Sequence, residues 1–262
     1  MYNSFLKIKN IIIIKLLYKK LLWGIREEMN IEEKVEILEK AKDFFSSVIV
    51  KNHKINTEKL SNIKEFNINP FLVKYLANFL TGSSNPKDIA KALIYPRVLG
   101  TSINTSFGQN LQKFCTTTLS GFASTTSGID IEFIDCLDGR KKYCQIKAGP
   151  NTINKDDVDT IINHFTGVKR LARTNNMQIN TTDLIVGVFY GKSEELNGNY
   201  KKIDKEYPVI VGEEFWYRLT GDKLFYYDLI DAIAESAIKE DCTNLLEDVI
   251  NNLAKEIEKS EK

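Results

Sequence analysis

The chain has 262 residues, of which 43% are hydrophobic and 27% charged, a composition that excludes a disordered or fibrous protein. Its formal net charge is only +1, so a DNA-binding surface, if present, must concentrate positive charge locally. The four cysteines form no CxxC pair and only two histidines occur. This pattern argues against a zinc site and favours reduced cysteines in a cytoplasmic protein.

Residues 1–28 contain short apolar runs that are interrupted by lysines. These runs are too short to span a bilayer, and no small-residue cleavage site follows them, so we expect neither a membrane anchor nor a signal peptide. An interfacial basic helix is one alternative. Because Met29 resembles a natural start, we interpret residues 1–28 as an N-terminal extension that is not part of the fold.

Residues 29–95 are predicted to form a helical N-terminal region. Apolar residues recur there at helical spacing, and Pro86 stands where helices often have a proline in their first turn. The predicted helices are Ile31–Ser47, Phe71–Leu80 and Pro86–Ile94. We expect Tyr95–Asn104 to be a polar linker and Ser106–Leu119 to be a further helix.

A β-hairpin is predicted between Gly128 and Asn154. The segments 130–134 and 143–147 each alternate polar and apolar residues, which is typical of a half-buried strand. Asp138-Gly139 is a strong signal for a two-residue turn. With that turn, Asp130 faces Lys147 and Glu132 faces Gln145, so all four polar side chains share one face of the hairpin.

The polar face of this hairpin suits metal-dependent hydrolysis of a phosphodiester. Carboxylates and a backbone carbonyl can bind Mg²⁺, which prefers oxygen ligands, and a bound metal acidifies a water molecule and neutralises charge on the phosphate. A neighbouring lysine can orient or deprotonate that water. The alternative is a surface hairpin with a cross-strand Asp–Lys pair, which would contribute at most about 1 kcal/mol.

The loop after Lys147 is the predicted phosphate-binding segment, because glycine allows close backbone approach and a helix N-terminus favours anions. A plain polar connection is the alternative. Candidate DNA contacts in this loop and in the segment before the Ser106 helix are Asn104, Thr105, Gly149, Asn151, Thr152, Asn154 and Lys155. His164 is interpreted as a packed or surface residue rather than a catalytic one, and the aromatic residues near Trp216 as core residues.

The remaining elements complete an alternating pattern of helices and strands. We predict a helix to about Arg173, a buried strand over Leu184–Tyr190, and helices over the C-terminal residues. The third strand of the core is either Val209–Val211 or a segment without a clear strand pattern. The last helix repeats Leu245, Val249, Leu253 and Ile257 at spacing four. This stripe indicates either internal packing or a dimer interface.

Four sequence blocks give this chain a resemblance to a known family. They are SINTSFGQNLQ (Ser102–Gln112), GIDIEF (Gly128–Phe133), CQIKAGPNTINKDDV (Cys144–Val158) and GEEFWYRLTGD (Gly212–Asp222). They resemble type II restriction endonucleases of the PD-(D/E)xK superfamily, particularly the group that cuts interrupted GG–CC sites. The resemblance runs from about Arg97 to Ala234. It implies an α/β (α+β) fold with an αβββαβ core, in which helices flank a mixed sheet.

The resemblance assigns roles to individual residues. Asp130 matches the metal-binding aspartate and Lys147 the catalytic lysine of the family. Gln145 stands where most members carry Glu or Asp, so its amide oxygen would replace a charged ligand, with Glu132 as the candidate that compensates. The carbonyl of Ile146 would complete the ligand set. Gln109 corresponds to a polar residue that holds a metal-bound water in relatives.

These observations predict a Mg²⁺-dependent type II restriction endonuclease that cleaves double-stranded DNA as a homodimer and leaves 5′-phosphates. Its functional partner would be a DNA methyltransferase of the same specificity. The alternatives are a structure-specific repair or junction nuclease and a non-catalytic DNA-binding protein with a decayed site. The nuclease core is expected over residues 96–212 and a helical C-terminal region, which could mediate dimerisation, over residues 213–262.

Overall fold

The computed structural model describes residues 29–238 and 242–260. They divide into two units, each built from segments that are not consecutive in the sequence. Unit 1 comprises residues 29–40 with Leu111–Ile230, and unit 2 comprises Ala41–Asn110 with the described residues from Asp231 onwards. The segment 1–28, expected to be an extension, lies outside the described residues.

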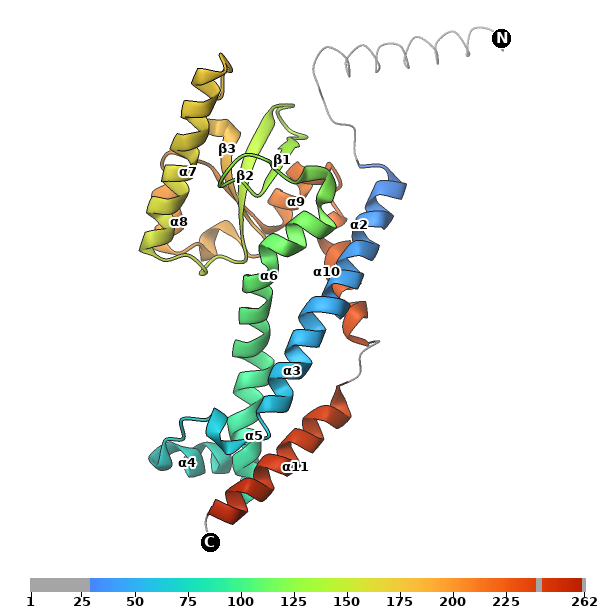
Figure 1. Ribbon diagram of the computed structural model, residues 1–262, viewed down its shortest axis with the longest axis vertical. Coiled ribbons are helices and arrows are strands. Elements are labelled where there is room, and N and C mark those ends of the chain that lie inside the picture. The colour runs from blue at the N-terminus through green and yellow to red at the C-terminus, as the bar shows by residue number, and fades with distance from the viewer. Residues whose placement is uncertain (1–28, 239–241, 261–262) are drawn as a thin grey trace, which may run out of the picture. The chain divides into compact units, whose positions relative to one another are not determined.

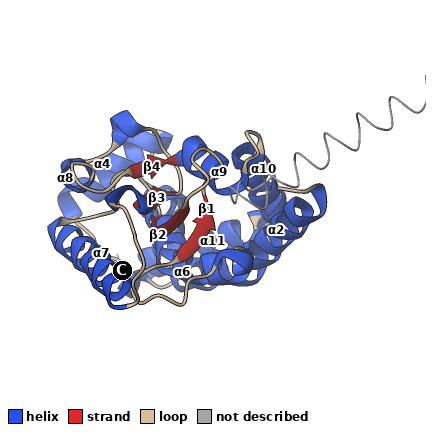
Figure 2. Cartoon of the chain, turned by 90° about the horizontal axis from the view of Figure 1, so that it is seen from above, coloured by secondary structure: helices blue, strands red, loops and turns tan. Residues whose placement is uncertain are grey.

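Unit 1 contains a four-stranded sheet in the order β1-β2-β3-β4. Figure 1 labels β1, β2 and β3, and Figure 2 labels all four strands. The strands are β1 (Ile131–Ile134), β2 (Lys141–Lys147), β3 (Leu184–Val188) and β4 (Val209–Val211). β1 pairs with β2 antiparallel, whereas β2–β3 and β3–β4 are parallel. The mixed sheet is confirmed, but the strand order along the chain differs from the αβββαβ expectation. The described residues form no third strand before the long helix, and the additional strand is β4.

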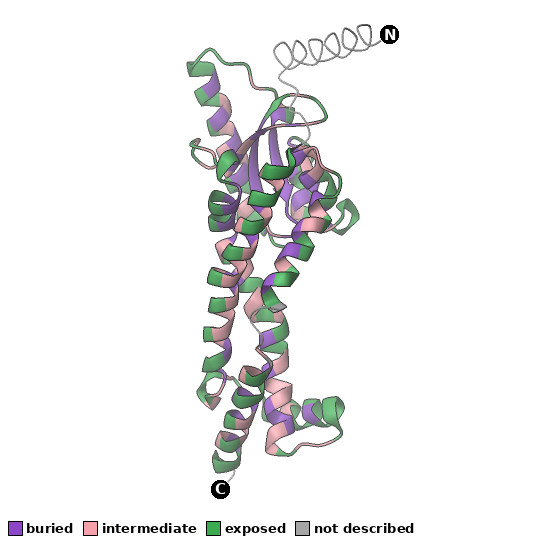
Figure 3. Ribbon diagram, turned by 90° about the vertical axis from the view of Figure 1, so that its right-hand side faces the viewer, coloured by how far each residue is buried: buried purple, intermediate pink, exposed green. Residues whose placement is uncertain are grey.

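Helices cover both faces of this sheet (Figure 2). On one face, α7 (Lys155–Thr174) and α8 (Gly198–Ile203) pack against alternate residues of β3. On the other face lie α9 (Gly212–Thr220) and the end of α6 (Ile103–Thr118), where Trp216 Nε1 donates a hydrogen bond to the Phe189 carbonyl at 2.9 Å. With both faces covered, the strands are mostly buried (Figure 3).

Two further helices belong partly to unit 1. α2 (Ile31–Phe44) is joined to it by Lys34, whose Nζ lies 2.6 Å from Asp222 Oδ2. α10 (Phe225–Ile238) contributes Phe225, whose ring lies 5.5 Å from that of Trp216. None of the helices in the described part of the chain combines the length and hydropathy needed to cross a lipid bilayer.

Unit 2 is helical. Its complete elements are η1 (Phe45–Val50), α3 (Lys51–Lys59), η2 (Ile63–Glu65), α4 (Pro70–Thr81), α5 (Pro86–Pro96), η3 (Arg97–Ser102) and α11 (Thr243–Ser260), and the first part of α6 also belongs to it. The predicted helices exist, but the expected linker at Tyr95–Asn104 is wrong, because the helix continues through η3 into α6. Pro96 cannot take part in the α-helical hydrogen-bond ladder, and the π-helical turn that follows it accommodates this break without ending the helix.

The apolar stripe of α11 is used inside unit 2. Val249, Leu253 and Ile257 are buried and pack with Ile89 and Ile94 of α5. Of the two interpretations of this stripe, internal packing is therefore the one observed, and the stripe does not provide a free dimer surface.

Candidate active site

The turn of the β1–β2 hairpin is longer than the sequence suggested. The Asp135 N–H donates to the Arg140 carbonyl at 3.0 Å, so Cys136–Gly139 form the turn. Gly139 takes the left-handed conformation at φ 68°, which only glycine adopts without cost. The strands therefore pair Ile131 with Cys144, two residues away from the predicted register.

A shift of two residues leaves every side chain on its expected face, because the side-chain period of a strand is two. Asp130, Gln145 and Lys147 consequently still share one face, the one covered by α7. Their neighbours change, however. Asp130 precedes the first paired residue of β1 and contacts Cys144 and Ile146 of β2, so it is not the direct cross-strand partner of Lys147.

Asp130 is fixed by two contacts to β2. Its N–H donates to the Cys144 carbonyl at 3.0 Å, and its Oδ2 accepts from the Ile146 N–H at 2.7 Å. Burial raises the pKa of the Asp130 carboxyl, although the Ile146 N–H and the nearby charge of Lys147 act in the opposite direction. None of the described residues donates a hydrogen bond to Oδ1, so this oxygen is open to a cation or water.

The expected pairing of Glu132 with Gln145 is wrong, since Glu132 lies opposite Tyr143. Its carboxylate is bound by Lys141 Nζ at 2.6 Å and by the hydroxyls of Ser124 at 2.5 Å and Thr126 at 2.8 Å. Burial would raise the pKa of Glu132, but these partners, Lys141 first, lower it below its usual value. Glu132 thus anchors the loop that precedes β1.

Two oxygens of β2 are further candidates for cation ligands. The N–H and C=O of one strand residue point to the same edge, and the Ile146 N–H meets Asp130, so the Ile146 carbonyl faces the same edge. The Gln145 amide contacts His164 through Nε2, 2.8 Å from Nδ1. None of the described residues donates to Gln145 Oε1, and this oxygen is not fully buried.

The donors gathered here fit a hard divalent cation. One carboxylate, one amide oxygen and one backbone carbonyl are the ligand types that Mg²⁺ accepts, with water filling the remaining positions. Within the described ranges, no group of three or more His, Cys, Asp or Glu side chains could hold a metal. A cation here would therefore depend on Asp130 for the only full negative charge in this set.

Lys147 lies at the end of β2, half-exposed, with its Nζ 3.9 Å from Asp157 Oδ1. Asp157 belongs to the first turn of α7 and accepts the N–H of the N-cap residue Asn154 at 2.8 Å. The first turn of α7 thus carries a carboxylate beside the Lys147 ammonium, whereas the sequence predicted Asp130 as the residue that faces this lysine.

His164 is the site residue that the sequence interpretation missed. The sequence predicts a packed or surface histidine, yet its ring contacts Gln145 and lies against Gly128. A usable signal existed in α7, because residues 157, 161, 164 and 168 recur at helical spacing. Since Ile161 and Val168 are fully or nearly buried, that spacing places His164 and Asp157 on the side of the helix that faces the sheet.

Part of the loop after Lys147 is held by hydrogen bonds within unit 1. Gly149 is buried, and its carbonyl accepts from Thr152 Oγ1 and from the Tyr200 hydroxyl, each at 2.9 Å. Asn154 caps α7 by accepting the N–H groups of Asp156 and Asp157. Gly149 therefore presents no exposed backbone for phosphate approach, whereas Asn151, Thr152 and Lys155 are exposed.

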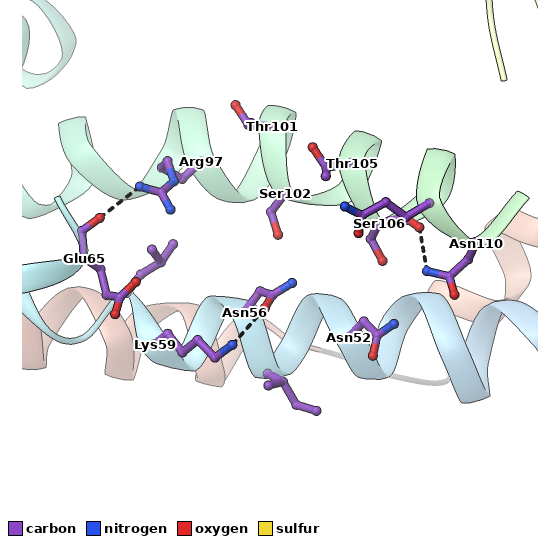
Figure 4. A pocket seen from close by; sticks show the side chains of 13 residues that line it. Asn52, Asn56, Lys59, Glu65, Arg97, Thr101, Ser102, Thr105, Ser106 and Asn110 are labelled. Carbon is purple, nitrogen blue, oxygen red and sulfur yellow. Dashed lines mark hydrogen bonds between the residues drawn. The ribbon is translucent and has the colours of Figure 1, made fainter. Parts of the chain in front are cut away.

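The remaining predicted site residues belong to the part of α6 in unit 2. Thr105 and Gln109 line a pocket of about 580 Å³ between α3 on one side and η3 with α6 on the other (Figure 4). Asn52, Asn56, Lys59 and Arg97 also line it, and the buried hydroxyl of Ser106 has no hydrogen-bond partner there. Asn104 is exposed and lies outside the lining.

Comparison with known proteins identifies the family of the chain. No curated protein sequence is similar enough to the chain to count as a match. The family model described as "Type II restriction endonuclease EcoO109I" matches residues 32–241, a stretch that contains the whole sheet, α7 and most of unit 2. The resemblance noted in the four sequence blocks is thereby confirmed. The chain belongs to the EcoO109I family of type II restriction endonucleases and is a site-specific deoxyribonuclease.

Proposed function

We propose that the chain cleaves double-stranded DNA in a Mg²⁺-dependent reaction at an interrupted GG–CC site and leaves 5′-phosphates. One observation carries this proposal. Asp130 Oδ1 and Gln145 Oε1 accept no hydrogen bond from the described residues. Both side chains lie on the sheet face that also carries Lys147, next to the first residue of β1. Carboxylate, amide oxygen and ammonium on one face are what hydrolysis of a phosphodiester requires.

The proposed cation ligands are Asp130 Oδ1, Gln145 Oε1 and the Ile146 carbonyl. Mg²⁺ held there would lower the pKa of a bound water and offset negative charge on the phosphate. Glu132 is left out of this set because its oxygens are engaged by Lys141, Ser124 and Thr126. With one carboxylate in the set, a phosphate oxygen of the DNA would supply part of the missing negative charge, so metal and DNA would bind cooperatively.

Lys147 is the proposed residue for positioning the attacking water. Its three N–H donors can bind that water and a non-bridging phosphate oxygen together. These hydrogen bonds strengthen as charge develops on the phosphate, and this is how a fixed donor lowers the barrier. Asp157, at 3.9 Å, holds the ammonium close to the end of β2 before DNA arrives.

DNA contacts are proposed on exposed polar residues of both units. In unit 1 these are Asn151, Thr152 and Lys155, which follow the catalytic lysine. In unit 2 they are Asn104 and Thr105, together with Lys59 and Arg97 of the polar pocket. Gln109 lines that pocket of unit 2, and its predicted role in holding a metal-bound water is not part of the site proposed in unit 1. Local clusters of this kind are needed because the net charge is only +1.

A homodimer is proposed because two identical active sites related by a two-fold axis match a palindromic target. The surface that fits a second copy is on α4. Phe71, Tyr75 and Phe79 are 89%, 62% and 80% exposed, and three leucines beside them are about half-exposed. Lys74 is the only charged residue of α4, so two such helices can meet without a close cluster of like charges.

The area of this α4 face is compatible with a dimer. Fully buried aromatic side chains cover roughly 150–250 Å² each, so these three rings at their exposed fractions offer on the order of 400 Å². The leucines add to this, and a standard interface buries about 800 Å² per partner. The α4 face would therefore supply at least half of the interface.

A plasmid cleavage assay tests the proposed function. With Mg²⁺, the chain should convert a plasmid that carries interrupted GG–CC sites into discrete fragments whose ends ligate directly, as 5′-phosphates require. Preference for branched substrates would indicate a junction nuclease instead, and intact DNA with a band shift would indicate a non-catalytic binder. In cells we propose a cytoplasmic location beside a methyltransferase that protects the same sequence.

A further inference from the structure

The contact between His164 and Gln145 is not accounted for by the cleavage scheme. Gln145 Nε2 lies 2.8 Å from His164 Nδ1. An amide nitrogen is only a donor, so Nδ1 accepts, and the imidazole is then neutral with its proton on Nε2. With its nitrogen bound to the ring, the Gln145 amide has a single orientation, in which Oε1 is free of protein donors.

The imidazole ring is itself held in place. Gly128 has φ +76°, and a Cβ at that position would lie 2.4 Å from His164 Cγ. Glycine is thus required at residue 128 both by its backbone conformation and by the ring packed on it. On the other side, Ile161 and Phe165 of the same helix are fully buried in the core, and they fix α7 against the sheet.

An unrestrained glutamine would be a poor cation ligand at this position. Its amide can rotate to present either oxygen or nitrogen, and only the oxygen binds a metal. A carboxylate has no such ambiguity, because both of its terminal atoms are oxygens. A residue that binds the amide nitrogen removes the unproductive orientation and leaves the oxygen for the cation, as the outer partners of metal ligands commonly do.

We propose that His164 is a positioning residue that fixes the Gln145 amide with Oε1 towards the metal site and so compensates for the missing acidic ligand. This inference rests on the proposed function, since it assumes that Gln145 binds the cation. Its chemistry is limited to one hydrogen bond, from Gln145 Nε2 to His164 Nδ1. His164 does not touch DNA or water in this role.

The test measures binding of Mn²⁺ alone to the full chain, with free Mn²⁺ followed by electron paramagnetic resonance. The His164→Leu variant keeps an apolar group of similar size over Gly128 but has no acceptor. It should bind Mn²⁺ about 10-fold more weakly than the wild type, the lower end of the usual effect of outer-shell partners, with an unchanged melting temperature. In the His164→Asn variant, Oδ1 takes the position of Nδ1 and accepts the same hydrogen bond, so affinity should return.

A Gln145→Glu background separates positioning from a merely structural role. Because a carboxylate needs no fixed orientation, His164→Leu should change Mn²⁺ affinity less than 3-fold there. An equal loss in both backgrounds, or wild-type affinity of His164→Leu in the native background, would overturn the inference. The Asp130→Ala variant tests the proposed function separately. If this variant binds Mn²⁺ as well as the wild type, the cation does not bind at the Asp130 site at all.

Discussion

Asp135, the residue with which the hairpin turn begins, is fully buried and paired with Arg218 of α9. Its Oδ2 accepts from Arg218 Nε at 2.8 Å and from Nη2 at 2.5 Å. A second contact joins the same segments, because the Cys136 N–H donates to the Arg218 carbonyl at 3.1 Å. The turn is therefore fixed by a helix more than 80 residues away in sequence, and the register of β1 on β2 follows from it.

Removing Asp135 should be strongly destabilising. Asp135→Ala leaves the Arg218 guanidinium, itself only 18% exposed, without its carboxylate, and breaking a buried pair in this way costs about 3–5 kcal/mol. Urea unfolding followed by circular dichroism measures the loss. Glu214→Ala is the matched control, because Glu214 is an exposed partner of the same arginine at 3.4 Å, and it should cost no more than about 0.5 kcal/mol. Equal losses for the two variants would contradict a structural role for the buried pair.

This ion pair also explains what the sequence could not predict. The alternation in residues 130–134 and 143–147 correctly indicated both strands and the face of each side chain, since these depend on local periodicity. The register depended on contacts of Asp135 with Arg218 and of Arg140 with Asp183, and no local pattern encodes them. The Asp138-Gly139 signal located the turn but not its length.

In the candidate site, too, the sequence predicted what depends on local spacing but not what depends on long-range packing. Asp130 and Lys147 could be identified from motif spacing, because a strand places alternate residues on one face. The partners of Gln145 and Lys147 come from α7, and they depend on how that helix packs against the sheet. The helix continuing past Pro96 was missed for a related reason, since burial of Val98 and neighbouring residues in unit 2 outweighs the local preference of proline to end a helix.

Stability should fall at acid pH through Asp183. Burial alone would raise the pKa of this carboxyl, but hydrogen bonds from Arg140 and from the Asn180 N–H, with the charges of Arg140 and Lys142, bring it below its usual value. A lowered native pKa stabilises the fold above the unfolded value of about 3.9, and this contribution is lost as the pH falls through the native pKa. The difference in unfolding free energy between wild type and Asp183→Asn should be constant from pH 7 to 5 and shrink below about pH 4. A difference that grew on acidification would have the wrong sign.

Lys147→Ala should lose DNA cleavage while retaining DNA binding. The ammonium is proposed to act on the water and the developing phosphate charge, and such groups contribute about 10²–10⁴-fold to the rate. Cleavage rates and gel-shift affinities on the same duplex measure the two effects separately. Lys141→Ala removes an exposed lysine of the same strand, which pairs with Glu132, and it should cleave at close to the wild-type rate. Full cleavage activity of Lys147→Ala would contradict the role of Lys147 in positioning the attacking water.

Gln145→Glu should preserve or raise activity and lower the Mg²⁺ concentration needed for half-maximal cleavage. The change adds a negative charge to a ligand set that otherwise contains only the Asp130 carboxylate. His164 tolerates it, because the imidazole can move its proton to Nδ1 and donate to the new carboxylate. A Mg²⁺ titration of the cleavage rate measures the shift. Loss of cleavage with intact folding would mean that the amide itself is needed at residue 145.

Phe79→Lys should convert the proposed dimer to a monomer. The ring is 80% exposed and stacks with Tyr75 at a centroid distance of 6.2 Å, so the substitution removes little from the fold of one chain. In a symmetric interface, however, each copy contributes the change, and a central aromatic anchor is worth at least about 2 kcal/mol. The dissociation constant of the dimer should therefore rise by roughly 30-fold or more for each of the two Phe79 rings that the substitution removes.

Sedimentation velocity of wild type and variant over a range of concentrations measures this dimer equilibrium. Leu99→Lys provides the control, because Leu99 is 71% exposed in η3 and outside α4, so the same apolar-to-lysine change should leave the dimer intact. If both variants sediment like the wild type, the α4 face is not the interface. If the wild type is a monomer at micromolar concentration, two chains must instead meet on the DNA, and cleavage should then depend on the square of the enzyme concentration.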